Sequence, residues 1–259
     1  MRVLLHAGFH KTGTSTVQQA LFHNRDALAP HLRLVPRARM APAGKAARAW
    51  SAGGNPVDLA LFGYELAQVM EEWDADDPRP MLISAEDLCG QMPGRAGVES
   101  YAAAAPLMRT VVDTLATLHP NAAPAFYFST RQTEDWLASA HAQHLRASRM
   151  TLSAEAFAGR YRAAADLATV VDGIAAALAP LPVHRCALEQ SRARPLGPLD
   201  PLLDLLALPE GLRDSLEPQP PVNPALPPDC LQGLLVLNRS DLDDAALRAA
   251  KRALIAECV

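Results

Sequence analysis

The first residues of the chain constrain its fold more than any other segment. The apolar run at residues 3–5 predicts a short buried strand, and HAGFHKTGTST (6–16) follows it directly. Gly8 and Gly13 mark this segment as a loop, and residues 15–28 show the apolar spacing of a helix. A strand, a glycine loop and a helix in immediate succession predict the opening unit of a parallel α/β domain.

Short apolar segments and longer helical patterns alternate along the rest of the chain. Further strands are predicted at 80–84, 125–129 and 183–188, and helices at 56–73, 98–118, 133–146, 153–178 and from 230 to the end. This alternation predicts one domain over residues 1–259, with a three-layer α/β/α fold and a central parallel sheet. Two segments are predicted to be loops: the variable stretch 36–55, rich in Ala, Arg, Gly and Pro, and the Pro-rich stretch 218–229.

Composition excludes several classes of function. The chain has 24 basic and 28 acidic residues, a net charge of −4, which argues against broad nucleic-acid binding. The apolar start is too short for a signal peptide or membrane anchor, and no later run is long enough to span a bilayer. The four cysteines lie far apart without a CxxC pair, so neither a zinc site nor a disulfide framework is indicated. We therefore expect a cytoplasmic protein with reduced thiols; the sequence does not indicate an oligomeric state.

The glycine loop has the parts of a phosphate site. Backbone N–H groups of such a turn and the start of the following helix both favour an anion. Hydroxyl groups can add hydrogen bonds, those of Thr12, Thr14, Ser15 and Thr16. Gly8 and Gly13 have the spacing of a P-loop, but Thr14 stands at the usual lysine position and the lysine comes earlier, as Lys11. The pattern indicates a phosphate compound other than ATP, although a βα turn can also carry glycines and threonines without binding anything.

The stretch HKTGTST resembles the 5′-phosphosulfate loop of sulfotransferases that use 3′-phosphoadenosine 5′-phosphosulfate (PAPS), whose common form is Lys-[Ser/Thr]-Gly-Thr-[Thr/Ser]. The resemblance implies a P-loop NTPase-like fold. It places six residues against the 5′-phosphate and the sulfonyl group: Lys11, Thr12, Gly13, Thr14, Ser15 and Thr16. His10 and Val17 depart from the Pro and Trp that cytosolic members often have, so the loop is closer to bacterial and carbohydrate-type members.

A second signature of the same family follows the predicted strand 125–129. In the family, an arginine at the end of a central strand and a serine eight residues on bind the 3′-phosphate. Here Arg131 and Ser139 have this spacing. An arginine offers a forked, permanently charged grip, and the serine lies about two helical turns further on. A surface helix explains such a pair equally well when it is taken alone, but its place behind the glycine loop strengthens the resemblance.

Sulfonyl transfer to an alcohol or amine needs a base for the acceptor proton and a cation for the leaving phosphate. Lys11 suits the second task. Glu86 comes just after the predicted strand 80–84. The resemblance aligns it with the catalytic histidine of cytosolic members. Many carbohydrate sulfotransferases use a glutamate as the base. Glu86 is therefore the first candidate, with capping of the following segment as its alternative role. His10 is the second candidate, for contact with the sulfonyl group or acceptor, or else an ordinary turn residue.

Asp87 carries the main competing signal. An acid after an apolar strand resembles a Walker-B acid, so the alternative function is a P-loop nucleotide or small-molecule kinase that uses ATP and Mg²⁺. A third alternative is a binding or scaffold protein with a degenerate loop. PAPS chemistry needs no metal, and His141 and His144 without a third ligand predict an exposed helix face rather than a metal site. The acceptor, a hydroxyl or amine of a carbohydrate, lipid or small metabolite, is left unidentified.

Overall fold

The computed structural model describes residues 1–220 and 226–258, and its centre is a five-stranded sheet in which every strand is parallel to its neighbours. The strand order is β2-β3-β1-β4-β5. The strands are β1 (Arg2–His6), β2 (Arg33–Val35), β3 (Met81–Ser84), β4 (Ala123–Thr130) and β5 (Val183–Ala187). The β1 residue His6 pairs with Ser84 on one side and Tyr127 on the other, so the strands end at a common edge.

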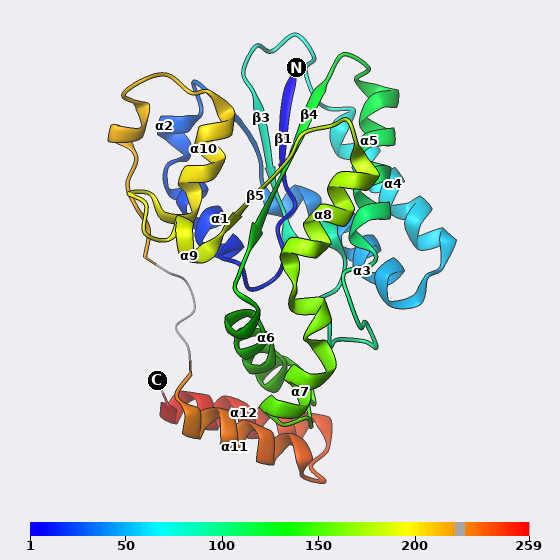
Figure 1. The fold of residues 1–259 in the computed structure, drawn as a ribbon, viewed down its shortest axis with the longest axis vertical. Helices are drawn as coiled ribbons and strands as arrows, with labels where there is room; N and C mark the ends of the chain where they lie inside the picture. The colour runs from blue at the N-terminus through cyan, green and yellow to red at the C-terminus, as the bar shows by residue number, and fades with distance from the viewer. Residues whose placement is uncertain (221–225, 259) are drawn as a thin grey trace.

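Helices cover both faces of the sheet (Figure 1). One face carries α1 (Thr14–His23), α2 (Arg25–Leu28) and α10 (Asp200–Leu206), and the other carries α3 (Ala41–Gly53), α4 (Pro56–Met70), α5 (Ala104–Leu118) and α8 (Leu167–Leu178). Successive side chains of β1 alternate between the two layers: Leu4 joins the α1 and α10 core, whereas Val3 and Leu5 join the larger core on the opposite face. This is the predicted three-layer α/β/α arrangement.

The remaining elements are short helical segments and the helices that follow β4 and close the chain. They are η1 (Arg37–Met40), η2 (Glu86–Cys89), α6 (Thr133–Ala147), α7 (Ala154–Tyr161), η3 (Ala163–Ala165), α9 (Leu188–Ser191), η4 (Gly197–Leu199), η5 (Leu212–Ser215), α11 (Pro228–Arg239) and α12 (Asp244–Cys258). The pair α11 and α12 lies beneath α6 and α7 in Figure 1. Buried Lys251 donates hydrogen bonds to the carbonyls of Leu145 and Ser148, at 2.7 and 2.8 Å, and so caps the carboxyl end of α6.

The prediction of a loop over residues 36–55 is wrong. Residues 37–40 form η1 and residues 41–53 form α3, in which Ala43, Ala46 and Ala47 make a buried face at helical spacing. Alanine is the best helix former, and its small side chain lets a helix pack closely, so an alanine-rich stretch with few large apolar residues is helical here. The segment is therefore part of the helical layer over the sheet.

Two further predictions need correction. The helix predicted over 153–178 is interrupted between α7 and α8, where Asp166 accepts a hydrogen bond from the Thr169 N–H and starts a new helix. In the Pro-rich stretch 218–229, residues 221–225 lie outside the described residues, and Pro228 already begins α11.

The expectation of four reduced thiols is also wrong. Cys230 at the start of α11 and Cys258 at the end of α12 are joined as a disulfide, with their Cα atoms 6.2 Å apart. The two cysteines are far apart in sequence, and only the packing of α11 against α12 brings them together. No helix within residues 1–220 and 226–258 has the length and apolar character needed to cross a membrane.

Candidate functional site

A cavity of about 720 Å³ opens at the carboxyl ends of the strands, beside the glycine loop. Four groups of residues line it. They come from the glycine loop (His10, Lys11, Gly13, Thr14, Ser15, Thr16), from the segment after β3 (Glu86, Gln91, Met92, Arg95), from β4–α6 (Arg131, Ser139, Gln143, Arg146) and from 188–219 (Leu188, Arg192, Arg194, Pro195, Gly197, Pro198, Pro218, Gln219). The carboxyl edge of a parallel sheet is where ligands bind in open α/β folds.

The amino end of α1 faces this cavity without a side-chain cap. Gly13 precedes the helix with φ 90° and has no side chain that could cap the first turn. A Cβ atom at Gly13 would lie 2.8 Å from the Leu188 Cδ1 atom, so both the backbone angle and the close approach require glycine. The N–H groups at the start of a helix and the helix dipole favour an anion at this end.

The glycine loop is held in place by the chain after β4. Lys11 has a left-handed backbone, φ 69°, and its carbonyl accepts a hydrogen bond from the Arg131 Nη1 atom at 3.1 Å. The indole Nε1 of Trp136 donates to the His10 carbonyl at 2.9 Å. Burial lowers the pKa of Lys11, and the nearby charges of Arg146 and Arg131 lower it further.

Two polar residues of the first strand and loop lie away from the cavity. Thr12 is fully buried, and its hydroxyl donates to the Phe9 carbonyl and lies 2.6 Å from the Ser129 Oγ atom. His6 is also fully buried, with its Nδ1 atom 2.9 Å from Ser84 Oγ, and burial lowers its pKa to about 3. His6 is therefore a packed residue of the strand end, and the Thr12 side chain supports the loop instead of reaching a ligand.

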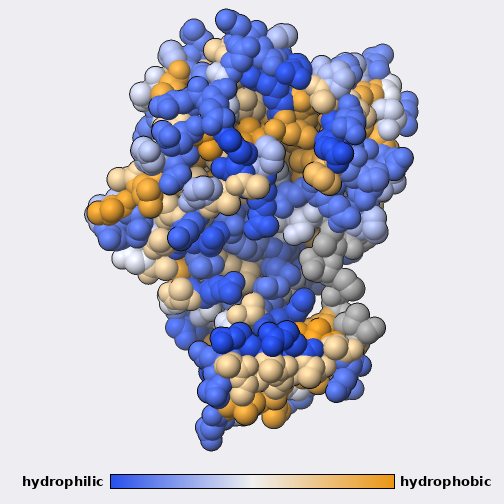
Figure 2. Space-filling view, turned by 180° about the vertical axis from the view of Figure 1, so that it is seen from behind, coloured by the Kyte–Doolittle hydropathy of each residue, from blue (hydrophilic) through white to orange (hydrophobic). Residues whose placement is uncertain are grey.

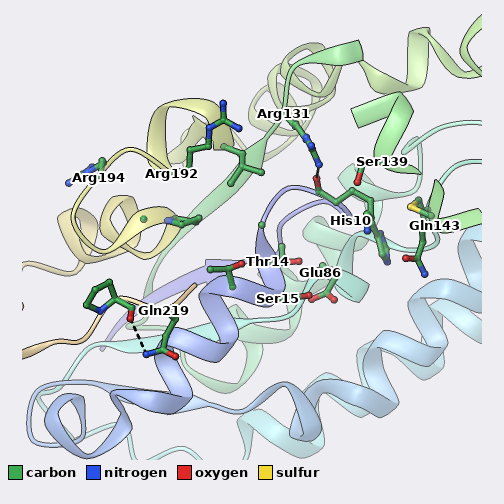
Figure 3. A pocket seen from close by; sticks show the side chains of 18 of the residues that line it. His10, Thr14, Ser15, Glu86, Arg131, Ser139, Gln143, Arg192, Arg194 and Gln219 are labelled. Atoms are coloured by element: carbon green, nitrogen blue, oxygen red, sulfur yellow. Dashed lines mark hydrogen bonds between the residues drawn. The ribbon is translucent and has the colours of Figure 1, made fainter. Parts of the chain in front are cut away.

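Arg131 and Ser139 both face the cavity (Figure 3). The Nε atom of Arg131 is buried without a hydrogen bond, and the nearest carboxylate, Glu189, is 4.0 Å away. Ser139 starts a line of polar side chains on α6 with Gln143 and Arg146 at i+4 and i+7. The helix therefore presents a continuous polar face to the cavity.

Positive charge dominates the cavity wall. Its cations are Lys11, Arg95, Arg131, Arg146, Arg192 and Arg194, and its one carboxylate among the described lining residues is Glu86. Arg194 pairs with Asp204 at 2.6 Å. No carboxylate of residues 1–220 and 226–258 pairs with Lys11, Arg95, Arg146 or Arg192. Grouped cations without counter-charges favour a ligand with several negative charges.

Glu86 lies in η2, immediately after β3, and its side chain is only 9% exposed. Gln18 of α1 donates from Nε2 to Glu86 Oε2 at 2.7 Å, and Arg37 Nη2 lies 3.3 Å from Oε1. Figure 3 shows the Glu86 side chain near Ser15 and Thr14. The two partners hold a carboxylate in a fixed orientation at the cavity wall.

Asp87 turns away from the cavity into a cluster of cations. Its carboxylate lies 2.6 Å from Arg48, 3.2 Å from Arg37 and 3.3 Å from the His10 Nε2 atom. Burial alone would raise the pKa of Asp87, but His10 and Arg48 outweigh it and hold the pKa well below its usual range. His10 also contacts Tyr101, whose hydroxyl is 3.4 Å from Nδ1, so both ring nitrogens have partners.

The structure also assigns cavity residues that the sequence did not single out. Gln143 and Arg146 continue the helical spacing of Ser139, and this periodicity is a signal that the sequence does contain. Arg192 and Arg194 lie beyond β5, across the cavity from α6 in Figure 3. Their basic segment resembled a loop and gave no indication of which cavity it would face.

Comparisons of the chain with protein-family models, with curated proteins and with solved structures gave no match. Within residues 1–220 and 226–258, no three or more His, Cys, Asp or Glu side chains form a group that could hold a metal ion. His141 and His144 are buried, and their Nε2 atoms lie 2.9 and 2.8 Å from the carbonyls of Leu152 and Pro93. The prediction of an exposed histidine face is therefore wrong.

Proposed function

We propose that the chain is a sulfotransferase that moves a sulfonyl group from PAPS to a hydroxyl or amine of an acceptor. The observation that carries the proposal is a group of cations near the amino end of α1, four of which have no carboxylate partner among residues 1–220 and 226–258, with one oriented carboxylate among the described lining residues. A PAPS molecule has a phosphosulfate at one end of its ribose and a phosphate at another. Both groups are anionic, and the cavity offers separate cationic walls for them.

The residues on the two sides of the cavity suit these two anionic groups. Thr14, Ser15 and Thr16 line the open helix end, and Lys11 stands beside them, which fits the 5′-phosphosulfate. Arg131 and Ser139 line the α6 side, which fits the 3′-phosphate. The Arg131 guanidinium lines the cavity, donates from Nη1 to the Lys11 carbonyl and lies 4.0 Å from the Glu189 carboxylate, so its charge is available to a bound phosphate. This arrangement also supports a P-loop-like assignment of the loop.

The chemistry assigns one task each to Glu86 and Lys11. In the transfer, the acceptor oxygen or nitrogen bonds to sulfur, the bond from sulfur to the 5′-phosphate oxygen breaks with its electron pair on that oxygen, and the acceptor proton leaves. Glu86 takes that proton, because Gln18 and Arg37 hold its carboxylate at the cavity wall. Lys11 stabilises the charge that develops on the leaving phosphate. His10 is less suited to proton transfer, because each ring nitrogen has a single site and both have partners, whereas each carboxylate oxygen of Glu86 keeps a second lone pair.

The kinase alternative has weaker support. A Walker-B acid must present its carboxylate to a nucleotide-bound magnesium ion. Asp87 is instead held by Arg37, Arg48 and His10 and does not line the cavity. Thr14 at the usual lysine position further weakens a site for a triphosphate.

A thermal-shift experiment tests the proposal directly. The product nucleotide 3′-phosphoadenosine 5′-phosphate should raise the melting temperature without magnesium, and Arg131→Ala should abolish most of the shift. Arg160→Ala is the matched control, because Arg160 pairs with Glu99 on the surface and should leave the shift unchanged. Stabilisation by ATP with magnesium, and none by the 3′-phosphorylated nucleotide, would favour the kinase and overturn the proposal.

A further inference from the structure

A second hollow of about 1030 Å³ runs along the β2 edge of the sheet. Figure 2 views the molecule from behind and shows hydrophobic surface gathered in a hollow in the upper half, between hydrophilic rims. We call this hollow the edge groove. Its apolar lining residues include Leu21, Phe22, Leu34, Val35, Val69 and Trp73. Its size is similar to that of ligand pockets, roughly 300–1,000 Å³.

Most charged side chains around the edge groove are ion-paired. Each of its five arginines has a carboxylate partner. Asp77 lies 2.6 Å from Arg79 and 3.6 Å from Arg33, and Arg39 pairs with Glu72. The wall thus combines apolar contact area with ion-paired side chains, and the Asp74 carboxylate accepts a hydrogen bond from the Asp76 N–H, which suits the body of a neutral molecule.

One end of the edge groove lies next to the side chains that hold the candidate catalytic carboxylate. Gln18, Arg37 and Ser84 line the groove, and the first two contact Glu86, which lines the cation-rich cavity. Gln18 also lies within 3.3 Å of the Ser84 carbonyl, so it spans the wall between the two hollows. At this point the two hollows are separated by the Gln18 and Arg37 side chains, so one end of a molecule in the groove lies close to Glu86 while the nucleotide occupies the cavity.

We infer that the edge groove is the acceptor site, and that the acceptor is a neutral alcohol with an extended apolar body and its hydroxyl at the Glu86 end. The inference rests on the proposed function, since it names the substrate class for the same carboxylate. A sugar, by contrast, would leave most of its hydroxyl groups against apolar side chains without hydrogen-bond partners.

A chain-length series of alcohols tests the inference. With PAPS as donor, kcat/KM should rise from 1-butanol to 1-octanol by roughly twofold to fourfold per methylene that enters the groove. Phe22→Asp should flatten this dependence, because it places a charge on the apolar wall. Phe22 is 68% exposed and so is a safe site for the change. Val236→Asp, on α11 at 60% exposure, is the matched control and should keep the full dependence.

Separate measurements distinguish the possible failures. If 3′-phosphoadenosine 5′-phosphate binds but rates do not depend on chain length, or methyl glucoside is the better acceptor, the acceptor inference is overturned and the proposed function stands. If that nucleotide does not bind, both are overturned. A concentration-dependent dimer that Phe22→Asp abolishes would show that the groove pairs two copies of the chain, which also overturns the inference. Saturation-transfer NMR signals from 1-octanol in the wild type and the Val236→Asp variant, lost in the Phe22→Asp variant, would support it.

Discussion

The cation-rich cavity and the edge groove lie on either side of Glu86, but they differ in whether their cations have carboxylate partners. The cavity groups six cations with one carboxylate, and several of the cations have no partner among the described residues. The groove also contains five arginines, but each pairs with a neighbouring carboxylate. The number of basic residues alone does not distinguish the cavity from the groove. The presence or absence of carboxylate partners for these residues does.

The difference has an energetic cost on one side only. Grouped cations that are partly removed from water repel one another and lose hydration, so the empty cavity is locally unfavourable. A bound polyanion removes that penalty, and its affinity should depend on charge and salt. The groove gains only from apolar contact, so binding there should depend on the size of the ligand.

The largest effect is expected from Glu86→Gln, which acts where the two regions meet. Turnover should fall by roughly 10²- to 10⁴-fold, the usual contribution of a general base. Nucleotide affinity should change little, because the cations that bind it are untouched. Single-turnover rates and calorimetry measure the two quantities. Glu217→Gln, which alters a surface partner of His23, is the control. Full turnover in the Glu86→Gln variant would move the role of the base to another group.

Lys11→Met should weaken nucleotide binding by roughly 10- to 100-fold, since a hydrogen bond to a charged group contributes about 1.5–3 kcal/mol. It should leave 1-octanol binding in the edge groove unchanged. Lys45→Met is the matched control, because Lys45 is exposed on α3 and does not line the cavity. Equal losses in both regions would mean that the Lys11 substitution disturbs the fold, and the contrast would then be unsupported.

Ionic strength should separate the two regions without any substitution. Nucleotide affinity should fall by about tenfold between 50 and 500 mM NaCl, because salt screens the interactions of partly exposed charges. Octanol binding should stay constant or become slightly tighter. Calorimetry measures the salt dependence of nucleotide affinity, and saturation-transfer NMR measures that of alcohol binding. The same salt dependence for both ligands would contradict the proposal that only the cavity binds through charge.

Most of the sheet could be predicted from the sequence, because buried parallel strands are continuous apolar runs. The runs that became β1, β3, β4 and β5 were predicted close to their observed positions. The strand β2 was missed, since its three residues, Arg33–Val35, are too few for a pattern and depend on pairing with β3. The helix α3 was missed because its buried face consists of small alanines, without the large apolar residues that mark a helix in the sequence.

The candidate site was predictable only where a motif is local. The glycine loop, Arg131 and Ser139 meet in one cavity as expected. The buried position of Thr12 depends on Ser129, a residue far away in sequence, so nothing local revealed it. The edge groove could not be predicted at all, because α1, β2 and the segment after α4 contribute to it together.

The smallest expected effect concerns pH and Arg146. Arg146 lowers the pKa of Lys11 through charge repulsion, although burial is the larger cause. Since only the protonated amine attracts an anion, nucleotide affinity should fall as pH rises through that lowered pKa. In the Arg146→Gln variant one repulsive charge is gone, so the pKa of Lys11 should rise and the alkaline loss of affinity should move to higher pH. Near neutral pH the same variant should bind about fivefold more weakly, because one attractive charge is also lost.

Affinity measured by calorimetry from pH 7 to 10 shows both changes at once. Arg160→Gln, at the surface pair with Glu99, should alter neither. Lys11→Met should remove the alkaline loss altogether, because arginines stay protonated over this range. An unchanged alkaline limb in the Arg146→Gln variant would show that a different group titrates, and the unpaired cations would then not act on one another as the cavity geometry implies.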